Sequence, residues 1–378
     1  MLRRSLSYHL RPGEALRHFT ANWFTVTMGT GVLALILAQM PGPAWLTATA
    51  PLVWKVNIGL FGLFSLLYAA RWLLYPREPA QIFSHPVAPM FLGAIPMGLA
   101  TIANGALVFA HDPDLALRLW AVESGLAVLA GLCVPAAMIL RQTHALEKMT
   151  AVWLLPVVPC EVAAAGAGLL APHLPAGLAA PLLVAGYGLW ALSVPLALGI
   201  LTILFLRLVL HSLPPPELAV SCWLPLGPLG TGALGLLLLG HAAPLAFSAT
   251  PLAAASSAAQ GLGIIGALVL WAYGLWWLGL AVVMTLAYRP HRLPFNMGWW
   301  GFTFPLGVFI LATNALAGQT DLRVFALTGE GLSWLFLILW AMVAARTLRG
   351  AYHGSLFVAP YVSQEASRGM GPAIGRGA

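Results

Sequence analysis

Long apolar runs separated by short polar breaks make up most of the chain. The first run begins at Trp23 and the last ends near Leu348. A helix needs about 20 apolar residues to cross the hydrocarbon core of a bilayer. Windows of that length predict ten spans, over residues 22–40, 52–75, 86–109, 117–140, 151–170, 182–206, 223–245, 260–287, 297–318 and 325–348. The pattern therefore predicts an all-α polytopic membrane protein.

The composition excludes a soluble enzyme or nucleic-acid-binding module. Of the 378 residues, 60% are hydrophobic and 8% are charged, whereas a soluble domain has roughly 45–50% apolar and about 25% charged residues. We expect a polar cytoplasmic arm at 1–21, a ten-helix membrane domain at 22–348, and a flexible cytoplasmic tail at 349–378. Because the first 21 residues are polar, the arm is not a cleavable signal peptide.

The basic residues predict the orientation of the chain in the membrane. With ten spans both termini lie on one side, and that side holds all of the 18 Lys and Arg residues except Lys55, Arg118 and Arg323. Lys and Arg are concentrated on the cytoplasmic side of membrane proteins. We therefore expect a multi-pass protein of the plasma (inner) membrane with both termini in the cytoplasm. This collar of basic residues also accounts for the net charge of +7 without a nucleic-acid partner.

Signatures of enzymes and cofactor proteins are weak. GLGIIG at 261–266 matches a dinucleotide fingerprint, but it opens an apolar span and follows no strand. The histidines lie near span ends or in the terminal segments, which argues against haem ligation, and the three cysteines have no metal-site spacing. We expect no cofactor, no metal and no catalytic site. An integral-membrane enzyme or electron carrier remains the alternative from another class.

A cluster of small residues and prolines repeats in every second span. The clusters are TMGTG at 27–31, PMG at 96–98, PVVP at 156–159, PLGPLG at 225–230 and PLG at 305–307. Proline inside a span bends the helix, and non-helical backbone in a membrane must be buried or line a watery path. The repeat predicts five helical hairpins around a central pore, with the odd-numbered spans inside. The alternative is that the prolines only kink packed helices.

The odd-numbered spans contain no Lys or Arg, and their only acidic residue is Glu161. Six hydroxyls, backbone amides and the positive ends of broken helices remain to attract a solute, which favours anions held weakly; the hydroxyls belong to Thr27, Thr30, Thr101, Thr231, Thr303 and Thr313. Glu161 is a candidate proton-binding or gating residue, because an ionisable group within a span is functional by default. A structural role is its alternative.

Three motifs resemble those of one known family. NWFTVTMGTG at 22–31, FLGAIPMG at 91–98 and WWGFTFPLG at 299–307 are similar to the first-, third- and ninth-helix signatures of the tellurite-resistance/dicarboxylate transporter family. That family includes TehA, slow anion channels, malate permeases and sulfite exporters. The resemblance covers about residues 15–350 and implies a homotrimer with one pore in each subunit.

The resemblance also implies a phenylalanine gate in the ninth span, which we assign to Phe304, with Phe302 as the second candidate. The expected pore-lining residues are Thr27, Met28, Gly29, Thr30, Pro96, Met97, Gly98, Pro156, Pro159, Pro228, Gly230, Thr303 and Pro305. The implied function is a channel or transporter for small inorganic anions or C4-dicarboxylates such as malate. Sulfite efflux is the alternative that the same signatures support.

Overall fold

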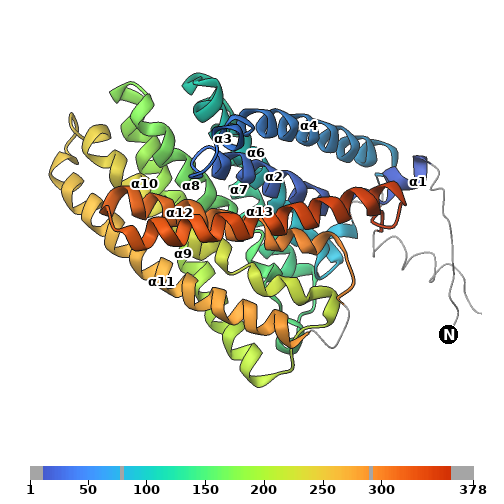
Figure 1. Cartoon of the computed structure of the whole chain (residues 1–378). Helices are drawn as coiled ribbons and strands as arrows, with labels where there is room; N and C mark the ends of the chain where they lie inside the picture. The colour runs from blue at the N-terminus through green and yellow to red at the C-terminus, as the bar shows by residue number, and fades with distance from the viewer. Residues whose placement is uncertain (1–11, 77–80, 289–292, 359–378) are drawn as a thin grey trace, which may run out of the picture.

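The computed structural model describes residues 12–76, 81–288 and 293–358, and the regular structure in these ranges is helical (Figure 1). The α-helices are α1 (Pro12–Arg17), α2 (Phe24–Leu37), α3 (Ala44–Ala48), α4 (Ala50–Leu74), α6 (Ala94–Ala110), α7 (Pro113–Arg141), α8 (Pro159–Leu170), α9 (Ala176–Leu210), α10 (Leu226–Ala246), α11 (Ser256–Ala287), α12 (Phe304–Thr320) and α13 (Arg323–Tyr352). The 3-10 helices are η1 (Ala21–Trp23), η2 (Gln81–Ser84), η3 (Ala88–Gly93), η4 (Leu146–Lys148), η5 (Ala151–Leu154), η6 (Ala171–His173), η7 (Pro216–Trp223), η8 (Ala253–Ala255) and η9 (Met297–Phe302).

Eight helices within the described residues are long and apolar enough to cross a membrane, and a shorter apolar helix covers Ala21–Leu37. The chain is therefore a polytopic membrane protein, as its sequence predicts. The expected continuous span at 151–170 is wrong in form, because η5 and the 12-residue α8 are separated by turns. Pro156 and Pro159 lie at this junction, where neither can donate a backbone hydrogen bond.

Buried and exposed helices alternate along the chain. Over their most apolar stretches, the segments that contain α6, α10 and α12 are 72–78% buried, whereas those that contain α4, α7, α9, α11 and α13 are 22–33% buried. Every residue of α2 is buried, and almost every residue of α8. The outer helices instead expose large apolar side chains such as Leu73 and Ile139. These faces suit a hydrocarbon environment.

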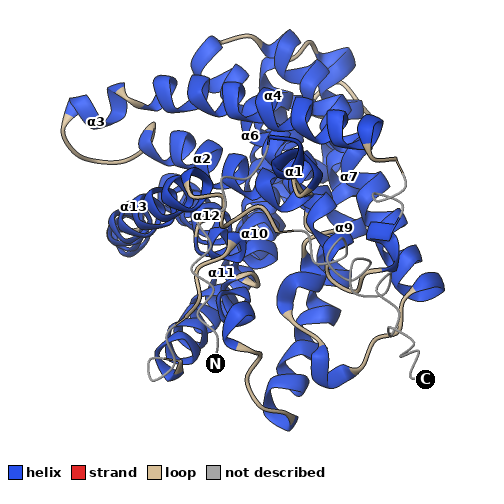
Figure 2. Ribbon diagram, turned by 90° about the vertical axis from the view of Figure 1, so that its right-hand side faces the viewer, coloured by secondary structure: helices blue, strands red, loops and turns tan. Residues whose placement is uncertain are grey.

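The five buried helices form a closed ring. Helix α2 contacts α6, α6 contacts α8, α8 contacts α10, α10 contacts α12, and α12 contacts α2. Each outer helix packs on the inner helix that precedes it in the chain, α4 on α2, α7 on α6, α9 on α8, α11 on α10 and α13 on α12, and also contacts the next inner helix of the ring. Figure 2 shows α2, α10 and α12 in the middle of the molecule with α4, α9, α11 and α13 around them. The fold is thus five consecutive inner–outer helix pairs.

The repeated prolines lie at the beginnings of the inner helices and not within them. Pro159 and Pro305 occupy the first turns of α8 and α12, Pro96 is the third residue of α6, and Pro225 immediately precedes α10. Proline is tolerated there because the first backbone N–H groups of a helix have no partner within the helix. The expected mid-helix breaks are therefore wrong, and the irregular backbone is a 3-10 turn before each inner helix.

Apart from Lys55, Arg118 and Arg323, the described Lys and Arg residues lie at the end of the molecule where the inner helices begin. Arg71, Arg141, Arg207 and Arg349 lie in the last turns of α4, α7, α9 and α13. The buried Arg207 donates hydrogen bonds to the carbonyl oxygens of Glu147 (2.6 and 3.1 Å) and Ser212 (2.8 Å). Other basic residues of the predicted collar lie outside the described residues, namely Arg3, Arg4, Arg11, Arg77, Arg289, Arg292, Arg368 and Arg376.

Candidate functional site

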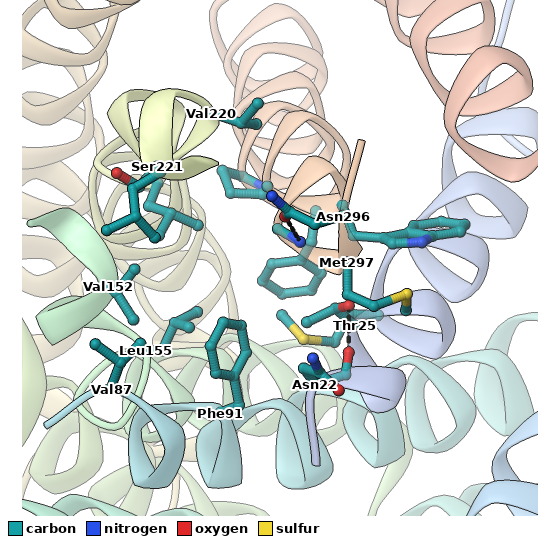
Figure 3. A pocket seen from close by; sticks show the side chains of 18 of the residues that line it. Asn22, Thr25, Val87, Phe91, Val152, Leu155, Val220, Ser221, Asn296 and Met297 are labelled. Atoms are coloured by element: carbon teal, nitrogen blue, oxygen red, sulfur yellow. Dashed lines mark hydrogen bonds between the residues drawn. The ribbon is translucent and has the colours of Figure 1, made fainter. Parts of the chain in front are cut away.

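A cavity of about 480 Å³ lies where the five inner helices begin (Figure 3). In four inner segments, wall residues recur three positions apart from the 3-10 turn into the beginning of the following α-helix, since residues i and i+3 share a face in both kinds of helix. These sets are Asn22, Thr25 and Met28; Val152, Leu155 and Val158; Leu218, Ser221, Leu224 and Gly227; and Gly298, Gly301 and Phe304. The remaining inner segment contributes Val87, Phe91 and Met97. The 3-10 turns and the beginnings of the inner helices thus build the cavity.

Each inner segment contributes one buried apolar residue to the cavity wall where its helix begins, and we call these five residues the cavity floor. They are Met28, Met97, Val158, Gly227 and Phe304. All five are buried, and Phe304 is 3% exposed. Two thioethers, an isopropyl group, a phenyl ring and a glycine make this part of the wall apolar. An apolar surface of this kind opposes the passage of a hydrated ion.

The wall of the cavity carries little charge. Among the described residues it contains no Lys, Arg or His, and its single acidic residue, Glu217, is exposed. Five parallel inner helices begin around it, so the positive ends of their dipoles point toward the same space. In the same ranges no three His, Cys, Asp or Glu side chains gather as a metal site would need. The arrangement can attract an anion weakly without binding it tightly.

Four of the residues expected at the pore contribute to the cavity wall, namely Met28, Met97, Phe304 and Pro305. The other expected residues are buried between helices and do not line the cavity: Thr27, Gly29, Thr30, Pro96, Gly98, Pro156, Pro159, Pro228, Gly230 and Thr303. Gly98, for example, faces Phe61 of α4, and Gly230 faces the backbone of Phe309 in α12. The glycines therefore allow close helix packing.

Five of the six threonine hydroxyls donate hydrogen bonds within their own segments. Thr27 donates to the carbonyl of Phe24 at 2.7 Å, and Thr231 donates to that of Gly227 at 2.7 Å. The hydroxyls of Thr101, Thr303 and Thr313 likewise donate to a carbonyl three or four residues earlier. A hydroxyl committed in this way has no proton left for a solute. The hydroxyl protons of these threonines are therefore bound to backbone carbonyls in this structure.

The two candidate gate residues occupy different surroundings. The ring of Phe304 lies at the floor of the cavity. Phe302 instead packs edge-on against Trp223 and Trp299, with ring centroids 5.1 and 5.7 Å apart. Of the two candidates, only Phe304 lines the cavity.

Glu161 lies in the first turn of α8, away from the cavity wall. Its carboxyl group is fully buried, and its polar neighbour is the Thr231 side chain of α10. Glu123 of α7 is also buried. Burying an isolated ionised carboxylate is far more costly than burying the neutral acid.

Residues at the rim of the cavity were missed by the sequence reasoning. Asn22, Ser221 and Asn296 line it, as do Ser355, Leu356 and Val358 from the segment after α13. That segment is held by Phe357, whose ring stacks on Trp23 with centroids 5.0 Å apart. A period of three could have pointed to Asn22 and Ser221, which share it with Thr25 and Leu224, but not to Asn296. No local pattern could have placed residues 355–358 at this opening.

A histidine holds the start of η3, beside the cavity. His85 Nδ1 accepts hydrogen bonds from the backbone N–H groups of Val87 and Ala88, both at 3.1 Å. Burial lowers the pKa of His85 below its ordinary value of 6.5. Two N–H donors aimed at Nδ1 also favour the neutral ring. The imidazole can therefore cap η3 only while it is uncharged.

We expect the fold to lose stability on acidification through His85. The pKa of His85 is lower in the folded than in the unfolded chain, so its contribution is complete above pH 6.5 and is lost as the pH falls through the folded pKa. The loss should be about 1 kcal/mol, as for other capping side chains. Thermal unfolding in detergent at several pH values should show it. His85→Asn, which keeps an acceptor, should flatten the dependence, whereas the same change at the exposed His353 should not.

Comparison with known proteins identifies relatives that are anion channels and transporters. The family described as voltage-dependent anion channel matches residues 18–348. A sulfite efflux pump of Arthroderma otae is 36% identical over 354 residues, which are 91% of this chain and 93% of the pump. The corresponding pump of Trichophyton rubrum is 35% identical over the same shares. A malic acid transport protein of Schizosaccharomyces pombe is 24% identical over 89% of this chain and 79% of its own.

Proposed function

We propose that this chain, which belongs to the voltage-dependent anion channel family, exports sulfite across the plasma membrane. The observation that carries the proposal is the cavity without basic side chains, surrounded by the beginnings of five inner helices. The oriented helix dipoles attract an anion weakly, and the apolar floor is a barrier that the anion must then cross. This combination suits permeation better than tight binding. Similarity to fungal sulfite efflux pumps over 91% of the chain supports sulfite as the substrate.

The permeation path in this proposal runs through the ring of inner helices. Segments α2 and α8 then complete ten spans, and the pore follows the axis of the ring from the cavity past Phe304. The basic residues at the same end of the molecule favour a cavity that opens to the cytoplasm. Their positive field would concentrate anions there. The exposed apolar faces of the outer helices would contact lipid and neighbouring copies in a homotrimer.

Charge favours sulfite over malate as the substrate. The cost of removing an ion from water rises with the square of its charge, and the cavity wall holds no cation to offset it among the described residues. Hydrogen sulfite carries one charge, whereas malate carries two at neutral pH. Malate remains the second candidate because of the similarity to a malic acid transport protein. A singly charged oxyanion fits this wall better than a dicarboxylate does.

The test is anion flux through purified protein in liposomes. We expect sulfite and nitrate to move faster than malate and sulfate, by about tenfold or more, which corresponds to about 1.4 kcal/mol in the barrier. Nitrate and sulfate keep their charges at all relevant pH values, so this pair separates the effect of charge from titration of sulfite. Protein-free liposomes control for leakage of neutral sulfur dioxide. Malate flux that exceeds sulfite flux would contradict the proposal, and flux that requires a proton gradient would indicate a coupled carrier.

A further inference from the structure

Most polar side chains on the cavity wall are committed to the protein itself. Thr25 donates its hydroxyl proton to the carbonyl of Asn22 at 2.6 Å, and the Asn296 amide donates to the carbonyl of Glu217 at 2.9 Å. The Asn296 side-chain oxygen is also used, because it accepts from the N–H of Gly298 at 2.7 Å.

The other side-chain hydrogen-bond donors on the wall, apart from Asn22, either donate to the protein or point away from Asn22. Trp300 donates its indole N–H to Thr347 at 3.0 Å, and Ser355 donates to the carbonyl of Gly350 at 3.3 Å. The hydroxyl of Ser221 is turned away from Asn22 in Figure 3, and Ser221 also borders a small space beside Trp277.

The exception is the amide nitrogen of Asn22. The side-chain oxygen of Asn22 accepts a hydrogen bond from the Thr20 hydroxyl, which fixes the plane of the amide. The nitrogen donates to no group among the described residues, and Figure 3 shows it on the side of the cavity. An amide that is oriented at one end and open at the other is prepared to bind a solute.

The position of Asn22 suits a contact at the opening of the path. It lies in η1, three residues before Thr25 and six residues before Met28 of the cavity floor, both in α2. Its neighbours on the wall include the apolar side chains of Phe91 and Met297. Apolar surroundings exclude water and strengthen a hydrogen bond to an anion. Because the amide is neutral, it can orient an anion without holding it permanently.

We infer that Asn22 is the hydrogen-bond donor that selects oxyanions over halides at this opening. The inference rests on the proposed transport function and extends it by naming a specificity-determining residue. An oxyanion offers fixed, strongly accepting oxygen atoms to an oriented N–H group, whereas chloride is a spherical and weaker acceptor. Hydrogen bonds to charged groups are among the stronger ones in proteins. Loss of the donor should therefore slow sulfite more than chloride.

The sharpest variant is Asn22→Asp in the full chain. It keeps the oxygen that accepts from Thr20 and replaces only the nitrogen donor by an oxygen. The measured quantity is the ratio of initial sulfite flux to initial chloride flux in liposomes, because a ratio does not depend on the amount of active protein. We expect this ratio to fall about tenfold. Asn22→Ala should lower it in the same direction without adding a charge.

The control is Asn57→Ala in the outer helix α4, because Asn57 is buried and does not line the cavity. Its side-chain amide donates to the Thr101 hydroxyl at 3.1 Å, so this variant should change the yield of folded protein and leave the flux ratio unchanged. An unchanged ratio in folded Asn22→Asp and Asn22→Ala would overturn the inference while sulfite transport by the wild type stands. A wild type that carries no sulfite would instead overturn the proposed function.

Discussion

Replacing Phe304 by alanine is expected to raise anion flux through reconstituted protein about tenfold, equivalent to a barrier lower by about 1.4 kcal/mol. The ring is buried at the cavity floor, where the inner segments converge. Removing it leaves an opening beside Gly227, Met28 and Met97 that a partly hydrated anion can enter. Sulfite and nitrate flux into liposomes, normalised to the amount of folded protein, measures the effect.

Phe302→Ala provides the matched control for this prediction. The residue lies two positions earlier and is equally buried, but it packs against Trp223 and Trp299 away from the cavity. Truncating a buried phenylalanine typically costs about 3–5 kcal/mol of stability, so we expect a lower melting temperature and no gain in flux. A folded Phe304→Ala protein with wild-type flux would show that the ring does not limit permeation.

Replacing Gly230 by valine is expected to abolish the folded protein. A Cβ atom at this position would lie 2.6 Å from the backbone nitrogen of Phe309 and 2.8 Å from its Cα. Both neighbours are backbone atoms of α12, so no side-chain movement can relieve the clash. Overpacking typically costs about 1–3 kcal/mol where side chains can adjust, and more is expected where helices must separate. Yield of monodisperse protein in detergent measures the outcome.

Gly279 of α11 tests whether the effect is specific to helix contacts. A Cβ atom there meets no other atom within 4 Å. Gly279→Val should therefore give normal yield, although both substitutions change a helical glycine to a β-branched residue. Normal yield of Gly230→Val would mean that α10 and α12 are not in close contact. Because the two helices are neighbours in the inner ring, loss of their contact would also deform the cavity.

The Gly230 and Thr27 positions show why part of the candidate site could not be predicted. Small residues and hydroxyls in apolar spans fit two situations, a pore wall or a close contact between helices. The choice depends on which direction each residue faces, and a helix that is buried all round has no polar face to indicate it. The pattern of hydrophobic residues along an inner helix therefore does not show which of its sides faces the axis of the ring. Contacts with the other helices determine that side.

The prolines illustrate a similar limit. Their repetition predicts five equivalent hairpins, and the structure has five inner–outer pairs in a closed ring. The expected breaks within the inner helices do not occur, because a proline in the first turn of a helix removes no hydrogen bond of that helix. The sequence pattern identifies a bend, whereas the position of the first hydrogen-bonded turn depends on packing.

Taken by itself, the sequence determined the membrane residence, the helical class, the order of inner and outer spans and the family, since these depend on composition, span length and local motifs. Only the tertiary structure decided which residues face the cavity, which hydroxyls are already committed, and that Asn22 presents an open donor beside Phe91. The reason is physical: burial and hydrogen-bond commitment are properties of contacts between segments. Segments distant in the chain meet only when the ring closes.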